Sequence, residues 1–352
     1  MIMKPVGSSA RDDLVLRCAR TPAPALVDLL KRTEWGTREV KYRVRGIPRI
    51  LGSIADPHFL TLERQGKLLG GVVGSRKTVT VAEKSYDAFF IAMIAIEPSV
   101  AGSGYGTYLA KLARQYAHTL LKEPGLIYLY VESTSKASLK VHRAVGYTPV
   151  GRVEARLFTR MYPKDDARVG RPTRQELVEL SSLLAEQYAG HALLDFDVSL
   201  RTGGCLVLRS SGKVAAAAQL RPMEWSLTRL RGLGGFLAMK VLPHLPVIRR
   251  GYSPDHVRFL RIGNIFVRPG HEAELERLLE ALLAKCGVHV AMIFLDPRSA
   301  LHNGFRARIG FGAFGGLVAE TIDVFADFKG LGQEEIARVC ALPINVSPAD
   351  PM

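Results

Sequence analysis

Three glycines at alternate positions, Gly102, Gly104 and Gly106, follow an apolar strand-like run and precede a helix-like stretch. Such a loop leaves successive backbone N–H groups bare, and the positive end of the following helix dipole strengthens their attraction for an anion. Glycine also lets the backbone approach phosphate oxygens closely. The pattern predicts a site for a pyrophosphate group, with a flexible turn as the alternative.

The loop fits neither common nucleotide-binding signature. Its spacing is GxGxG, whereas dinucleotide-binding folds use GxGxxG, and the chain contains no GxxxxGK[ST] sequence. Neither HExxH nor GxSxG occurs, so zinc protease and serine hydrolase chemistry lack their motifs. The four cysteines have no CxxC spacing and no histidine at metal-ligand spacing, so we expect no disulfide framework and no metal site.

The elements that must position this loop alternate between strands and helices. Periodicity predicts a hairpin at 59–73, strands at 88–96, 126–131 and 148–153, and helices at 23–33, 107–121 and 136–144. A polar stretch at 163–172, rich in turn formers, predicts a linker. The order then restarts with a helix at 176–189, a hairpin at 204–220, a strand at 263–267, a helix at 272–284 and a strand at 288–295. This repeat predicts two domains of similar fold, at 1–162 and 173–352.

The loop and its surroundings resemble the GNAT N-acetyltransferase superfamily. Ala101-Gly-Ser-Gly-Tyr-Gly106 is similar to the family's R/Q-x-x-G-x-G/A loop, with Ala101 in place of Arg or Gln. Further on, Ser135, His142 and Gly146-Tyr147 stand where the family has Asn, Tyr and a GF-like pair. The resemblance implies the α/β (α+β) class, with two tandem GNAT-like domains, each a mixed, mostly antiparallel sheet flanked by helices.

The resemblance also implies a co-substrate, acetyl-CoA or another acyl-CoA, and no metal. In the family the loop holds the pyrophosphate of coenzyme A, and two strands splay apart around the pantetheine arm. The implied contacts here are Ala101, Gly102, Ser103, Gly104, Tyr105, Gly106 and Thr107 for the pyrophosphate, Ile94, Ala95 and Ile96 for the acyl-pantetheine, and Ser135 for the arm. The backbone N–H near Ile96 is expected to polarise the thioester carbonyl.

Two catalytic roles follow from the same resemblance. His142 takes the place of the family's tyrosine, and an imidazole can protonate a departing thiolate, although a packed or solvated helix histidine is the alternative. A base must deprotonate the attacking ammonium group. Its candidates are Glu132, Glu97, Asp87 and a bound water molecule, and Glu132 ranks first because it ends a strand beside the expected splay.

The second domain keeps the outline of the first but loses its loop. At Pro269-Gly-His-Glu-Ala-Glu274, acidic side chains replace glycines and would repel a pyrophosphate, so we expect no coenzyme A there. An apolar insert at 229–250, with arginines at both ends, is too short and too interrupted by proline to cross a bilayer. We expect it to be a helix buried against the first domain. Its alternatives are contact with an anionic membrane surface or with a greasy substrate.

Composition sets the remaining limits. The 352 residues are 47% hydrophobic and 23% charged, which excludes disordered and collagen-like classes. The net charge of +15 is concentrated in residues 1–170, with 27 basic and 15 acidic side chains, and favours an anionic partner. No nucleic-acid motif accompanies it, so nucleic acid is not an expected partner. No apolar signal segment or 18-residue apolar run occurs, so we expect a cytoplasmic protein, with the inner membrane face as the alternative location.

These observations predict an acyl-CoA-dependent N-acyltransferase, acetyl by default, in which an uncharged small-molecule or peptide amine attacks the thioester directly. Within this class, a long-chain acyl donor or a lipid-like acceptor is the alternative that the insert raises. From another class, the alternative is a protein that binds acyl-CoA or a membrane without catalysis. The departures from the family's pattern at Ala101, Ser135 and His142 support that alternative.

Overall fold

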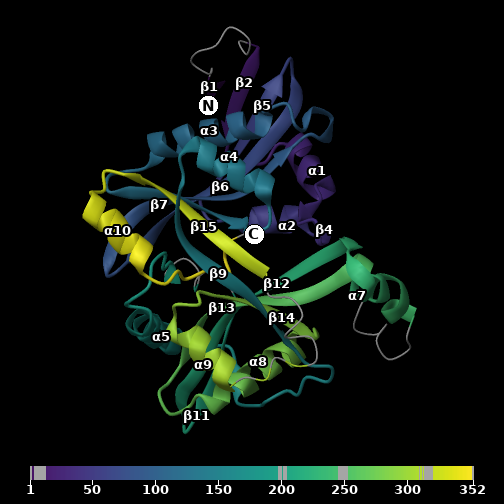
Figure 1. Cartoon of the computed structure of the whole chain (residues 1–352). Helices are drawn as coiled ribbons and strands as arrows, with labels where there is room; N and C mark the ends of the chain where they lie inside the picture. Colours follow the sequence, from purple (N-terminus) through teal and green to yellow (C-terminus); the bar gives the residue numbers. More distant parts are fainter. Residues whose placement is uncertain are drawn as a thin grey trace.

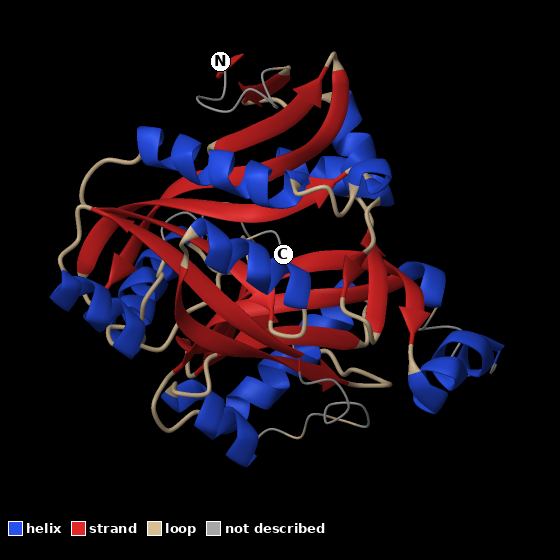
Figure 2. Cartoon of the chain, turned by 45° about the horizontal axis from the view of Figure 1, so that its top comes forward, coloured by secondary structure: helices blue, strands red, loops and turns tan. Residues whose placement is uncertain are grey.

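The computed structural model describes residues 2–3, 13–196, 200, 204–244, 253–308, 310, 312 and 320–350. One continuous sheet runs through the molecule, with helices against its faces (Figures 1 and 2). Its strand order is β1-β2-β5-β6-β7-β8-β15-β9-β14-β13-β12-β11-β10. Of the ladders between named strands in the described residues, β7–β8 and β13–β14 are parallel and the others antiparallel. The expected mixed, mostly antiparallel α/β fold is therefore confirmed.

The first half contains the elements that the periodicity predicted. Its strands are β1 (Ile2–Met3), β2 (Leu14–Ala19), β3 (Trp35–Gly36), β4 (Val40–Val44), β5 (Pro57–Arg64), β6 (Lys67–Val81), β7 (Lys84–Ile96), β8 (Gly125–Glu132) and β9 (Thr148–Thr159). Its α-helices are α1 (Pro24–Arg32), α2 (Ile47–Gly52), α3 (Tyr105–Leu120) and α4 (Lys136–Val145). The β5–β6 hairpin turns at Gln65 and Gly66, both at positive φ, as a tight two-residue turn requires.

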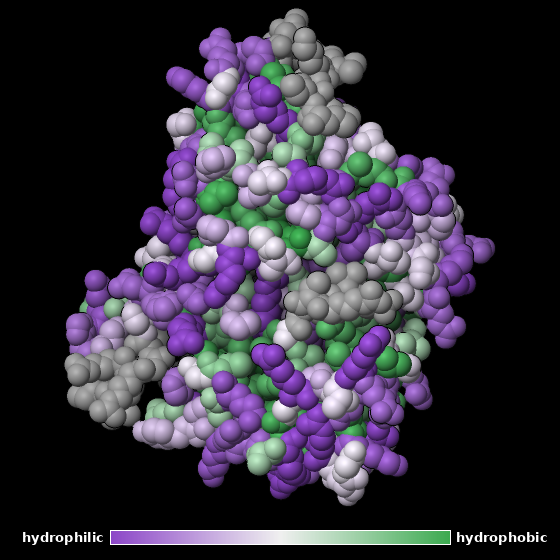
Figure 3. Space-filling model, turned by 180° about the vertical axis from the view of Figure 1, so that it is seen from behind, coloured by the Kyte–Doolittle hydropathy of each residue, from purple (hydrophilic) through white to green (hydrophobic). Residues whose placement is uncertain are grey.

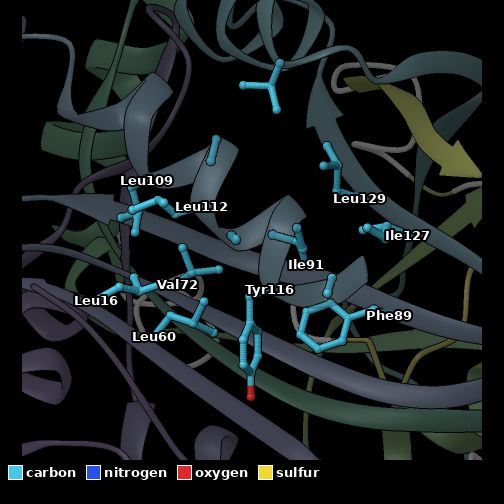
Figure 4. Close-up of a cluster of buried hydrophobic side chains, with 14 of the residues drawn as sticks. Leu16, Leu60, Val72, Phe89, Ile91, Leu109, Leu112, Tyr116, Ile127 and Leu129 are labelled. Carbon is cyan, nitrogen blue, oxygen red and sulfur yellow. The ribbon is translucent and has the colours of Figure 1, made fainter. Parts of the chain in front are cut away.

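Helix α3 packs on the sheet through one apolar face. Its buried residues Leu109, Leu112 and Tyr116 recur at helical spacing. Figure 4 shows these side chains together with Leu60, Val72 and Phe89 from the strands beneath, in a single buried cluster. This packing fixes the start of α3, and with it the glycine loop, against the end of β7.

The second half repeats the predicted order of helix, hairpin, strand, helix and strand. It comprises β10 (Val169–Gly170), α5 (Arg174–Gln187), β11 (Gly204–Ser210), β12 (Lys213–Leu230), α7 (Gly232–Phe236), β13 (Val257–Val267), α8 (Ala273–Cys286), β14 (Val290–Leu295), α9 (Ala300–Arg308), β15 (Glu320–Lys329) and α10 (Gln333–Ala341). The segment 163–172, expected to be a linker, includes β10, which pairs with β11. It is also held by Arg168, which forms ion pairs with Asp166 and Glu274.

Strands are exchanged between the two halves. We expected β9 to close the first domain's sheet, but it lies between β14 and β15. The position beside β8 is filled by β15, which pairs with every residue of β8. Figure 1 shows β15, in yellow, beside β9 in teal. The two halves are consecutive in sequence, but their strands interleave in the sheet.

Buried ion pairs also connect the halves. Lys77 on β6 contacts Asp195, at 2.7 Å, and Asp350, and all three side chains are at most 5% exposed. Arg114 on α3 donates to Asp327 on β15 at 2.8 Å. On the surface, Figure 3 shows hydrophilic residues along most of the outline of the face seen from behind.

Candidate active site

The glycine loop lies between β7 and α3, as predicted. Gly102 and Gly104 have φ of +85° and +80°, in the left-handed region that favours glycine, and Gly104 is the N-cap of α3. The Ala101 and Ser103 N–H groups donate to carbonyls within the loop. In the described part of the chain, no hydrogen-bond acceptor is found for the backbone N–H of Gly102, Gly104, Gly106 or Thr107. These donors, at the N-terminus of a 16-residue helix, are arranged to hold an anion.

Strands β7 and β8 separate beyond their first residues. Their parallel ladder runs from Asp87↔Gly125 to Ile91↔Leu129 and then stops, although both strands continue. A bulge in β7 interrupts its pairing with β6 between Met93 and Ile91, where the separation begins. A bulge bends its strand, so this irregularity accounts for the opening. The splay that the sequence implied is therefore present.

The amide groups of Ile94 and Ile96 point into this opening. The Glu97 N–H donates to the Leu69 carbonyl on β6, and successive residues of a strand direct their backbone groups to opposite sides. Ile94 and Ile96, opposite Val72 and Gly70, consequently direct theirs away from β6 and toward β8. Among the described residues, no strand pairs with them on that side.

A cleft of about 380 Å³ opens where the strands part. It is lined by both halves of the chain. The residues used below are Trp35, Lys41, Tyr42, Ile94, Ala95, Ile96, Glu132, Ser135 and His142 from the first half, and Met223, Trp225, Phe259, Arg261, Met292, Phe294 and Glu320 from the second. Six of the thirteen predicted site residues therefore line one cleft: Ile94, Ala95, Ile96, Glu132, Ser135 and His142. The loop 101–107 is not part of the lining and begins five residues after Ile96.

Comparisons with known proteins agree with this geometry. Residues 26–147 match the acetyltransferase (GNAT) family model. They form a GNAT acetyltransferase domain. The chain is accordingly an acyltransferase, and acyl-CoA is its co-substrate. No curated protein matches the sequence.

Solved structures share the fold of the whole chain, including the part beyond the GNAT domain. Saccharomyces cerevisiae N-myristoyltransferase with bound myristoyl-CoA superimposes with a TM-score of 0.58 at 9% identity, covering 93% of this chain and 83% of that one. A GCN5-related N-acetyltransferase from Sphaerobacter thermophilus gives a TM-score of 0.50 at 13% identity, covering 91% and 98%. At these identities the likeness concerns the fold alone.

Glu132, the favoured base, ends β8 within the cleft of the GNAT domain. Its pKa is raised to about 8, first by burial and then by the neighbouring Glu320, whereas Lys41 opposes the rise. A carboxyl with such a pKa can accept a proton from an ammonium group far more readily than an ordinary glutamate can. Glu320 lies on β15, in the second half, and sequence reasoning missed it.

The other two candidate bases are engaged elsewhere. Asp87 receives two hydrogen bonds from Arg76, at 2.7 and 3.0 Å, and these contribute to a lowered pKa. Glu97 forms an ion pair with Arg32. Neither residue lines the cleft. Of the three carboxylates, Glu132 is the one that the structure places at the splay.

His142 lines the same cleft from α4. It is buried, and burial lowers its pKa to about 4, so the imidazole is neutral at physiological pH. Among the described residues its Nδ1 has no hydrogen-bond partner. Ser135 is the N-cap of α4, and its hydroxyl donates to the Ser138 hydroxyl at 3.0 Å. A neutral imidazole can donate one hydrogen bond but is a poor source of a full proton.

The corresponding splay in the second half is filled by the chain itself. The β13–β14 ladder stops at Ile262↔Ile293. Beyond it, the segment 343–350 lies against both strands: the Asn345 side chain donates to Asn264 at 3.0 Å, and the Ile344 N–H donates to Asp296 at 2.8 Å. The cavity that remains beside Asn264, Asp296 and Asn345 has a volume of about 20 Å³, against about 380 Å³ for the cleft where β7 and β8 part.

The apolar insert is not a buried helix, contrary to our expectation. Its described part, 229–244, continues β12 and then forms α7 and short helical turns, which project from the body at the right of Figures 1 and 2. Leu233 is 78% exposed and Phe236 57%. Residues 245–250 lie outside the described part. The far end of the long strand β12 pairs with β4 of the first half. The segment that follows β12 therefore leaves the sheet outside the packed core.

Two further comparisons with the sequence predictions concern membranes and metals. No helix in the described residues is long and apolar enough to span a bilayer. Within the same residues, no group of three or more His, Cys, Asp or Glu side chains is placed to hold a metal ion.

Proposed function

We propose that this protein transfers an acyl group, acetyl by default, from coenzyme A to a primary amine. The observation that carries the proposal is one cleft that joins the outward-facing amides of Ile94 and Ile96 to the Glu132 carboxyl. The N–H groups of Gly102, Gly104, Gly106 and Thr107, which have no acceptor in the described part of the chain, hold the pyrophosphate of the donor. Its pantetheine arm lies between β7 and β8, beside Ala95 and Ser135.

Each of these residues has a separate role in the reaction. Glu132 takes a proton from the acceptor's ammonium group, and the resulting amine attacks the thioester carbonyl. The N–H of Ile96 holds the carbonyl oxygen as negative charge develops on it. Because His142 is neutral, it positions the departing sulfur through a hydrogen bond while a water molecule supplies the proton. The amide and free coenzyme A leave.

Donor binding is tested by isothermal titration with acetyl-CoA and, in parallel, with myristoyl-CoA. Gly102→Asp places a negative charge in the loop and is expected to abolish binding. Gly270→Asp is the matched control: both glycines have φ above +80°, and a side chain at either would meet no atom within 4 Å. Absence of binding by the unmodified protein, or equal loss in both variants, would overturn the proposal.

The same titrations separate the alternatives. Tighter binding of myristoyl-CoA would indicate that the donor is a long-chain acyl-CoA and not acetyl-CoA. The fold shared with N-myristoyltransferase is the reason to test this alternative. A protein that binds either donor but acylates no amine would be an acyl-CoA-binding protein and not an enzyme. Turnover is followed by release of free thiol in the presence of a panel of small-molecule and peptide amines.

A second candidate function is supported by the exposed side chains of the insert. We propose that Leu233, Phe236, Leu237 and Val241 contact an anionic membrane surface, aided by Arg231 and Lys240. The protein should then co-sediment with vesicles containing phosphatidylglycerol and less with pure phosphatidylcholine. The double substitution Leu233→Ser and Phe236→Ser should abolish this, whereas Val178→Ser, at a residue 67% exposed elsewhere, should not. Equal sedimentation of all three proteins contradicts membrane contact.

A further inference from the structure

Three glutamates line the cleft, and two of them, Glu132 and Glu320, come from different halves of the chain and lie on one face of the sheet. The third, Glu34, is paired with Arg43 at 3.3 Å. Glu132 is directly opposite Ile322 in the β8–β15 ladder. Glu320 is two residues from Ile322 along β15, so its side chain is on the same face as that of Glu132. Diagonal neighbours of this kind are within reach of each other when their side chains are long, and a hydrogen bond connects the two carboxyls. The Ser133 N–H, which donates to Thr321 at 2.9 Å, fixes the two strand ends together.

Lys41 acts on this pair only through its charge, which lowers the pKa of Glu132. In the described residues, neither carboxyl has an ion pair with a lysine, arginine or histidine. The other charged and titratable groups that line the cleft are Glu34 before β3, Lys41 and Tyr42 on β4, Tyr130 on β8, His142 on α4 and Arg261 on β13. Lys41 donates to the Gly36 carbonyl, and Arg261 donates to the carbonyls of Ser347 and Asp350. A partly buried carboxyl pair without a counter-ion favours a cationic ligand.

The opposite wall of the cleft is aromatic and apolar. Tyr42 stacks on Trp225 with ring centroids 3.9 Å apart, and Trp225 meets Phe259 edge to face at 4.6 Å. Met223, Met292 and Phe294 continue this surface. Such a wall gains free energy by covering an apolar or aromatic skeleton. The cations that share the lining, Lys41 and Arg261, would repel a second positive charge on the ligand.

We propose that Glu320 is a further catalytic residue which, with Glu132, binds the acceptor's ammonium group, and that the acceptor is an arylalkyl or alkyl amine without other charges. This rests on the proposed function above. The acceptor site is thus made by both halves, with the GNAT domain supplying the donor site and one of the two carboxyls.

The protons balance as follows. The free pair holds one shared proton, which leaves to solvent when the ammonium group binds, because the added positive charge removes the repulsion that retained it. Glu132 then accepts a proton from the ammonium nitrogen. The nitrogen then forms its bond to the acyl carbon, and the carbon–sulfur bond breaks. The second proton of the nitrogen passes through water to the departing thiolate. The third stays on the amide, and the pair is again singly protonated.

The test uses the full chain and two matched probes, 2-phenylethylamine and 2-phenylethanol, which differ in the group that the pair would bind. Titration at pH 7 in two buffers of different ionisation enthalpy should show that binding of the amine releases about one proton. Glu320→Gln should weaken amine binding by about tenfold or more, the value of a charge-assisted hydrogen bond, and should abolish the proton release. Binding of 2-phenylethanol should not change.

Controls separate this inference from the proposed function. Glu334→Gln, an exposed carboxylate on α10, should bind the amine like the unmodified protein. Acetyl-CoA should bind equally well to the unmodified protein, Glu320→Gln and Glu334→Gln. If acetyl-CoA binds and the amine does not, or if Glu320→Gln binds the amine as tightly as the unmodified protein, the inference is overturned while the donor site stands. If acetyl-CoA does not bind, the proposed function itself fails.

Discussion

At the scale of single residues, two carboxyls in one cleft oppose each other's ionisation. Burial raises the pKa of both Glu132 and Glu320, and the charge of Glu320 adds to the rise at Glu132, so the pair retains a proton at a pH where ordinary glutamates have lost theirs. This arrangement gives a base of suitable strength, but it carries a cost in stability, because the folded protein disfavours the doubly charged form.

The first prediction concerns this cost. A carboxyl whose pKa is raised on folding binds its proton more tightly in the folded state, so stability is highest below the unfolded value and falls as pH rises toward about 8. Glu320→Gln removes the repulsion. We expect it to raise the melting temperature at pH 9 by roughly 2 °C or more and to change it little at pH 5. Thermal unfolding at both pH values measures this, and an equal shift at both would contradict the ionic cause.

The second prediction concerns catalysis. Glu132→Gln keeps the shape of the side chain but cannot accept a proton, so turnover should fall by about 10²- to 10⁴-fold, the usual contribution of a general base. Binding of acetyl-CoA should not change, because the proposed donor contacts are the loop, Ile94 to Ile96 and Ser135, and not the Glu132 side chain. Steady-state rates with 2-phenylethylamine, together with donor titration, test both parts. Unchanged turnover would assign the proton transfer to water.

Sequence reasoning found one member of this pair and missed the other for a physical reason. Glu132 follows an obvious apolar strand and precedes a motif, so its position at a strand end could be predicted. Glu320 belongs to no motif. Its place beside Glu132 depends on the pairing of β15 with β8. The alternating pattern of Glu320 to Lys329 indicates a strand, but such a pattern does not specify a partner.

At the scale of elements, the loop follows the family's backbone geometry but lacks the family's side chain at position 101. Ala101 is exposed and its backbone conformation, φ −61° and ψ 140°, is open to any residue. The third prediction is that Ala101→Arg adds a charge-assisted contact to the donor's phosphates and tightens acetyl-CoA binding by about tenfold. The gain should diminish as salt is raised. Titration at two salt concentrations measures this, and no gain would mean that position 101 does not face the phosphates.

Local elements were predictable because their causes are local. Helix α3 shows its buried face as a 3.6-residue period, and the β5–β6 hairpin shows its turn as a glycine between two alternating runs. The exposed position of the insert could not be predicted from its apolar composition. Its exposure follows from the length of β12 and the pairing of β12 with β4, which is a tertiary property.

At the scale of the whole molecule, the buried group of Lys77, Asp195 and Asp350 joins strand β6 to the second half. The fourth prediction is that Lys77→Met lowers the free energy of unfolding by about 3–5 kcal/mol, because it leaves two buried carboxylates without their partner. Lys84→Met is the control: it removes an exposed contact with Glu335, also between the halves, and should have little effect. Guanidinium unfolding measures both variants, and similar stabilities would contradict a structural role for the buried group.

The exchange of strands has a consequence for synthesis on the ribosome. The place beside β8 stays empty until β15 has been translated, and β8 ends near residue 132 whereas β15 ends at residue 329. At about 5–20 residues per second, roughly 10 to 40 s pass between the two. During that time the nascent chain exposes an unpaired apolar strand edge, so this protein should depend on chaperones that bind early and release late. A fragment that ends before β15 would keep that edge permanently and should aggregate.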